Sequence, residues 1–287
     1  MADPIYGHDR RPGSLAQLSR FTRGGNDQMA NFLLPLAKQD IFFKFYDFDE
    51  DTINSDWTVG NGGGASATSP TASTSLEYGQ LTSTTGTANG ATSTTGISYD
   101  GIFFDAARNP GMLVRLKLGA VSAAYLEVSW CDAPTSLTVL NWSDVDTATP
   151  TQASNDVTDI ASVVFDTSQT NKSARLCTVG STDTTTLGVN MSAATTTAGD
   201  PLGAGTFHTI LLQCGATKTT PAANTSWVYA NIDGKASNEA FAVHGTTFLN
   251  QGLDSGKKIR PHILLQARSA TGVVLTIDYI ALWCNRE

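Results

Sequence analysis

One glutamate lies at the centre of an expected strand, where its carboxylate could take part in catalysis. Glu127 lies in the middle of the alternating segment from Tyr125 to Trp130. Glycosidases cleave sugar bonds with two carboxylates that flank the bond, and a spacing such as E-x-D-x-x-E places both on one strand face. The residues after Glu127 are Val, Ser, Trp, Cys and Asp, so that spacing is missing. We therefore predict a structural Glu127 on the solvent face of its strand, no catalytic residue and no enzymatic activity.

An acidic segment follows the first run of alternating residues. Asp47, Asp49 and Asp51 carry oxygen atoms of the kind that Ca²⁺ prefers. An EF-hand loop that began at Asp47 would need glycine at its sixth position, where Thr52 stands. The four histidines are far apart and have no ligand spacing. We expect a solvated turn here and no cofactor, with a calcium site at the three aspartates as the alternative.

A tryptophan stands in a long polar segment that we expect to be a loop, residues 132–158. Trp142 has Asn141 and Asp144 as neighbours. Sugar-binding sandwich proteins combine an aromatic platform with Asp or Asn groups from loops, so these three residues are the candidate glycan contact. The alternative is a tryptophan that anchors the loop by packing or lies in an interface.

Composition excludes several classes of protein. The 287 residues carry a net charge of −8, which argues against nucleic acid as a partner because phosphate binding needs a clustered basic surface. No apolar run approaches the roughly 20 residues of a membrane span, and the start does not resemble a signal peptide. Only 15% of the residues are charged, and glycine, serine and threonine are abundant. Such chains favour strands and turns over helices.

From residue 41 onward, short alternating apolar segments are separated by polar turns. We count about a dozen strands and almost no helix, which predicts an all-β, two-sheet antiparallel sandwich or jelly roll over residues 41–287. Residues 112–118 and 125–130 are joined by a short link and are expected to form a hairpin. The predicted core consists of Phe43, Phe45, Trp57, Val114, Leu116, Leu126, Val128, Trp130, Phe165, Ile210, Leu212, Val228, Ile232, Leu264, Ile277, Tyr279 and Ala281.

Residues 1–40 differ from the rest and form a separate N-terminal arm. The arm carries short apolar clusters and several arginines but too few apolar residues for a core of its own. Such a segment is either disordered alone or ordered against a partner. The residues expected to dock are Arg10, Arg11, Leu15, Leu18, Arg20, Phe21, Arg23, Phe32, Leu33 and Leu34.

Five motifs, in order, resemble the concanavalin-like jelly-roll domains of bacteriophage virion proteins. They are the F-Y-D-F-D-E-D-T-I-N-S-D-W segment at 45–57, the strands at 112–118 and 125–130, the F-H-T-I-L-L strand at 207–212, the Y-A-N-I-D-G-K segment at 229–235 and the I-D-Y-I-A-L-W strand at 277–283. The resemblance covers about residues 41–287. A short arm on a single sandwich further resembles a capsid decoration, or cement, protein.

That resemblance implies a structural protein on the outside of a phage capsid. It would stabilise the shell by bridging subunits of the major capsid protein through its arm, often as a homotrimer, after synthesis in the host cytoplasm. The resemblance implies neither nucleic acid nor membrane as a partner. The alternative is a glycan-binding module of a fibre or tail that recognises sugars on the host surface.

Overall fold

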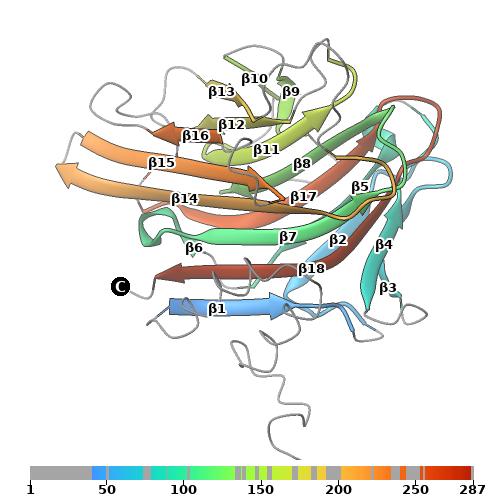
Figure 1. Cartoon of the computed structure of the whole chain (residues 1–287), viewed down its shortest axis with the longest axis horizontal. Helices are drawn as coiled ribbons and strands as arrows, with labels where there is room; N and C mark the ends of the chain where they lie inside the picture. Colours follow the sequence, from blue (N-terminus) through green and yellow to red (C-terminus); the bar gives the residue numbers. More distant parts are fainter. Residues whose placement is uncertain are drawn as a thin grey trace, which may run out of the picture.

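The computed structural model describes residues 41–285, with gaps at 50–51, 74–78, 89, 102–103, 133–136, 138–139, 146–148, 154–156, 170–173, 182–185, 192–201, 221–222, 234–239, 244–252 and 255. The arm at 1–40 lies outside the described residues. Two eight-stranded antiparallel sheets face each other, which confirms the predicted sandwich (Figure 1). In the described residues, helical structure is limited to two short 3₁₀ turns, η1 (Ala91–Ser93) and η2 (Ala106–Arg108).

The first sheet has the strand order β16-β15-β14-β7-β18-β4-β3, and β1 also pairs with β18. Its strands are β1 (Ile41–Tyr46), β3 (Thr68–Ser73), β4 (Gln80–Thr84), β7 (Gly111–Leu118), β14 (His208–Thr220), β15 (Ala223–Ile232), β16 (Ala240–Val243) and β18 (Val274–Asn285).

The second sheet has the order β13-β12-β11-β8-β17-β5-β2, and β6 also pairs with β17. Its strands are β2 (Trp57–Asn61), β5 (Thr94–Tyr99), β6 (Phe104–Asp105), β8 (Ala124–Cys131), β11 (Ile160–Asp166), β12 (Arg175–Val179), β13 (Leu187–Asn190) and β17 (Lys258–Ala267). A small ribbon of β9 (Trp142–Asp144) and β10 (Thr151–Gln152) interrupts the expected loop 132–158.

The predicted hairpin of residues 112–118 and 125–130 is wrong, because these strands belong to different sheets. β7 pairs with β14 and β18, while β8 pairs with β11 and β17. Both strands are central, so each needs a partner on both sides, and strands distant in sequence supply them. The link between β7 and β8 therefore crosses from one sheet to the other.

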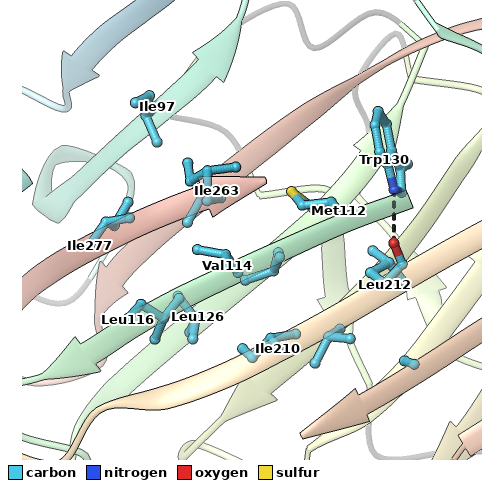
Figure 2. Close-up of a cluster of buried hydrophobic side chains, with 14 of the residues drawn as sticks. Ile97, Met112, Val114, Leu116, Leu126, Trp130, Ile210, Leu212, Ile263 and Ile277 are labelled. Carbon is cyan, nitrogen blue, oxygen red and sulfur yellow. Dashed lines mark hydrogen bonds between the residues drawn. The ribbon is translucent and has the colours of Figure 1, made fainter. Parts of the chain in front are cut away.

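The main core fills the space between the two sheets (Figure 2). Most predicted core residues lie in it: Trp57, Val114, Leu116, Leu126, Val128, Trp130, Phe165, Ile210, Leu212, Val228, Ile232 and Ile277. The Trp130 indole of β8 donates a 3.2 Å hydrogen bond to the Leu212 carbonyl oxygen of β14. This bond joins the two sheets through a fully buried polar group, in keeping with the rule that such groups find partners.

Five predicted core residues lie elsewhere. Phe43, Phe45 and Ala281 are buried on the outer face of the first sheet, and Tyr279 is half-buried beside them. Leu264 is buried but does not belong to the core between the sheets. A register shift in β18 between Ile277 and Tyr279 explains part of the error. A bulge inserts one extra residue, so simple alternation fails beyond it, and Ile280 and Leu282 take the inward positions.

At one end of the sandwich, a polar bridge joins β1 to the start of β2. Asp56 accepts hydrogen bonds from Lys44 Nζ at 2.6 Å and from Tyr46 Oη at 2.7 Å. Burial by itself raises the pKa of Asp56, but the hydrogen bonds from Lys44 and Tyr46 outweigh it, and the pKa lies below its usual value. Asp56 therefore stabilises the fold in its ionised form.

Asp56→Asn is expected to lower the free energy of unfolding at pH 7 by about 1 kcal/mol. Because the folded pKa lies below the unfolded value of about 3.9, the contribution is complete above that pH. The contribution is lost as the pH falls through the folded pKa. Urea unfolding should show a difference between the unmodified chain and the variant at pH 7 that shrinks below about pH 4. An equal difference at pH 7 and pH 3 would contradict this assignment.

Candidate functional site

A row of polar side chains crosses the outer face of the second sheet. The register aligns five residues on five adjacent strands: Ser162 on β11, Ser129 on β8, His262 on β17, Ser98 on β5 and Thr58 on β2. Residues directly opposite each other in paired strands point to the same face. We call these five residues the polar row. Its groups are hydroxyls and one imidazole, which both donate and accept hydrogen bonds.

Glu127 lies next to the polar row and is completely buried, not on the solvent face as predicted. Its carboxylate accepts hydrogen bonds from Tyr125 Oη at 2.7 Å and from Ser129 Oγ at 2.6 Å. Asn141 adds a bond from its backbone N–H at 3.2 Å and a second from its side-chain amide. The alternation of the sequence correctly places Glu127 on the face of β8 that points away from the core between the sheets. It cannot show that a segment distant in sequence covers this outer face.

The covering segment consists of Leu137 and residues 140–145, which we call the cover. Trp142 Nε1 donates to Ser162 Oγ at 3.0 Å, and Asn141 bonds Glu127. At the β2 side, a Cβ atom on Gly60 would stand 3.2 Å from Leu137 Cδ1, so Leu137 lies directly over this glycine. The cover therefore contacts the outer face of the second sheet at Gly60 of β2 and again at Glu127 of β8 and Ser162 of β11.

This burial corrects the predicted glycan contact. Trp142 and Asn141 are almost completely buried and hold the cover on the sheet. A buried indole offers no open ring face to a sugar, so the alternative, a packing anchor, is the correct reading of Trp142. Asp144 lies at the end of β9 opposite Thr151, where it is half-buried.

His262 is the most unusual member of the polar row. Its side chain is completely buried, and within the described part of the chain neither ring nitrogen has a hydrogen-bond partner. Burial lowers the pKa of His262; Glu127 opposes this shift and Arg260 adds to it. The hydroxyl of the neighbouring Ser98 is also buried without a partner among the described residues. Buried polar groups are usually paired, so two adjacent exceptions mark a place with free hydrogen-bonding capacity.

The polar row opens to solvent at its β2 end. Thr58 is exposed and its hydroxyl donates to the Asp100 carboxylate. Arg260 Nη1 donates to the other oxygen of Asp100 at 2.7 Å. The same face thus changes from fully buried groups at Glu127 to accessible hydroxyl, carboxylate and guanidinium groups at the edge. Sequence reasoning missed His262, Ser98 and Thr58, because only strand register brings them together.

The remaining sequence-based candidates lie apart from this face. No group of residues that could hold a metal ion is found among the described residues. Asp47 and Asp49 follow β1, whereas Asp51 lies outside the described residues. The docking residues of the arm also lie outside them, so attachment to a capsid, a homotrimer and a place on a virion stay predictions. No helix in the described part is long and apolar enough to cross a membrane.

The four cysteines are free, and three of them are buried. Burial raises the pKa of the thiols of Cys131, Cys177 and Cys214. A high pKa and lack of solvent access make a thiol unreactive. These cysteines therefore act as small apolar residues of the packing.

No protein-family model matches the sequence, and no curated protein is detectably similar to it. Solved structures of similar fold do exist. One, from work on endo-acting O-glycanases of the human gut microbiota, is 10% identical over 85% of this chain and 98% of its own, with a TM-score of 0.49. A GH16 protein of the Bacteroides ovatus mixed-linkage glucan locus is 11% identical over 82% and 98%, with a TM-score of 0.43. The carbohydrate recognition domain of Emp46p is 9% identical over 83% and 94%, with a TM-score of 0.44.

This comparison corrects the prediction that the chain is not an enzyme. The proteins of similar fold include glycoside hydrolases. The missing E-x-D-x-x-E spacing alone does not exclude activity, because not every glycosidase uses that pair of carboxylates. Fold alone does not assign a function, which has to be argued from the site.

Proposed function

We propose that this chain is a carbohydrate-binding jelly-roll protein that holds its ligand at the open end of the polar row. The observation that carries the proposal is the pair of buried, unpartnered groups, His262 and Ser98, directly behind the exposed Thr58. A hydroxyl-rich ligand that binds at Thr58 lies beside Ser98, the nearer of these two groups.

The chemistry of the row fits a sugar better than an anion or a cation. A neutral imidazole has one donor and one acceptor nitrogen, and serine and threonine hydroxyls can do both. Sugar hydroxyls have the same dual capacity. At the open end, Asp100 and Arg260 pair with each other, so together they bring no net charge. The exposed carboxylate of Asp100 can accept hydrogen bonds from neighbouring hydroxyls of one ring.

A glycan array that includes mucin-type O-glycans and mixed-linkage glucans is the first test, followed by calorimetry on the full chain. We expect saturable binding, and Asp100→Ala should weaken it by about tenfold to hundredfold, because hydrogen bonds to charged groups contribute about 1.5–3 kcal/mol. Asp105→Ala is the matched control, since Asp105 pairs with Lys258 outside the polar row. The proposal would be refuted if no glycan on the array bound the protein. It would also be refuted if the Asp100→Ala and Asp105→Ala variants bound with equal affinity.

A further inference from the structure

The outer face of the first sheet is strongly apolar, although it lies on the side away from the core between the sheets. Its buried members come from four strands: Ile41, Phe43 and Phe45 of β1, Leu113 of β7, Leu211 of β14, and Ala281 and Trp283 of β18. Tyr229 and Tyr279 pack against them at the margin. We call this set the outer apolar face. Figure 1 shows β1, β18, β7, β14 and β15 next to one another in this order.

Side chains on this face are buried without help from the second sheet. Trp283 is 2% exposed and Phe43 is 6% exposed, values typical of an interior. Every described member of the cluster belongs to strands of the first sheet, and a single sheet layer cannot enclose side chains that point away from the core. Glycine at position 111 lets the Trp283 indole lie across β7, because a Cβ there would stand 2.2 Å from the ring. The face is thus shaped to receive a covering layer.

We propose that the N-terminal arm, residues 1–40, is this covering layer and packs on the outer apolar face of its own sheet. The arm joins the sheet at Ile41, which is both the first residue of β1 and a member of the face. At about 3.3 Å per residue, even half of the arm can span the sheet. The arm also has apolar side chains with which to cover this face: Leu15, Leu18, Phe21, Met29, Phe32, Leu33, Leu34 and Leu36.

Covalent attachment favours this arm over a separate molecule. A tethered segment has a high effective concentration at a site that its linker can reach. Here no linker is needed, because residue 40 is bonded directly to Ile41, a member of the outer apolar face. Val274 is the only large apolar side chain that is exposed among the described residues. No cluster of exposed large apolar side chains is therefore found elsewhere among the described residues.

Hydroxyl-radical footprinting of the full chain, read by mass spectrometry, tests the proposal. In the unmodified chain, Trp283 and Phe43 should be protected at every protein concentration. In a variant with Leu33→Asp and Leu34→Asp, their oxidation should rise several-fold. A matched control with Asn26→Asp and Gln28→Asp adds the same charges to polar positions of the arm and should leave the protection intact. Trp130, inside the sandwich, reports in each sample whether the domain is folded.

Three results would overturn the proposal. Rapid oxidation of Trp283 in the unmodified chain would mean that the face is bare. Protection that disappears on dilution, together with a larger mass by light scattering, would mean that a second copy covers the face. Unchanged protection in the Leu33→Asp, Leu34→Asp variant, with Trp130 still protected, would mean that the arm is not the covering layer.

Discussion

Trp130→Ala lowers the free energy of unfolding by about 3–5 kcal/mol, the largest effect that we expect from a core substitution. The indole is completely buried between the sheets and packs edge-on against Phe104, with ring centroids 5.0 Å apart. Alanine removes this contact and leaves a cavity that well-packed neighbours cannot fill. It also leaves the Leu212 carbonyl oxygen without the indole as its donor.

Urea unfolding of both proteins measures this loss. Trp130→Phe is the informative control, because it keeps an aromatic ring and removes the hydrogen bond to Leu212. We expect it to cost about 1–3 kcal/mol, which separates the polar link from the packing. A loss below about 1 kcal/mol for Trp130→Ala would be incompatible with a tryptophan at the centre of the core.

Glu127→Ala has the second-largest expected effect, about 2–5 kcal/mol, because several buried donors lose their acceptor at a cost of about 1–3 kcal/mol each. The substitution deprives Tyr125, Ser129 and Asn141 of the acceptor that they share in a region without solvent. Unsatisfied buried donors cost more than the net value of the bonds that they made. Because two of the lost bonds come from Asn141, the cover should also detach from the sheet.

Two measurements distinguish these consequences. Chemical unfolding gives the loss in stability, and hydrogen exchange at residues 140–145 reports detachment of the cover. Lys258→Ala, which removes the exposed partner of Asp105, should change stability by less than about 1 kcal/mol. Normal protection of residues 140–145 in Glu127→Ala would show that Asn141 does not hold the cover.

Sequence alternation correctly predicted the sandwich and most of its core. β7, β8 and β11 carry apolar residues in a regular pattern, and their positions follow from that pattern. The pattern failed at Tyr279 and Ala281, because a bulge in β18 shifts the face by one residue. Nothing local in the sequence signals the bulge.

The candidate site was much harder to predict. Ser98, Ser129 and His262 are neighbours only because of the register between strands that are distant in sequence. Trp142 was recognised as important, but its burial depends on a long-range bond to Ser162. Local periodicity contains information about which face a residue takes. It contains none about which distant segment will cover that face.

The pairing of the first and last strands has a consequence for synthesis. Ile41 lies opposite Asn285, and β18 lies between β1 and β7. A growing chain therefore holds β1 and one edge of β7 without their partner until residues 274–285 have left the ribosome. Folds dominated by such distant pairings also form slowly. The nascent chain has to keep these apolar strands from other molecules until β18 is available to pair with them.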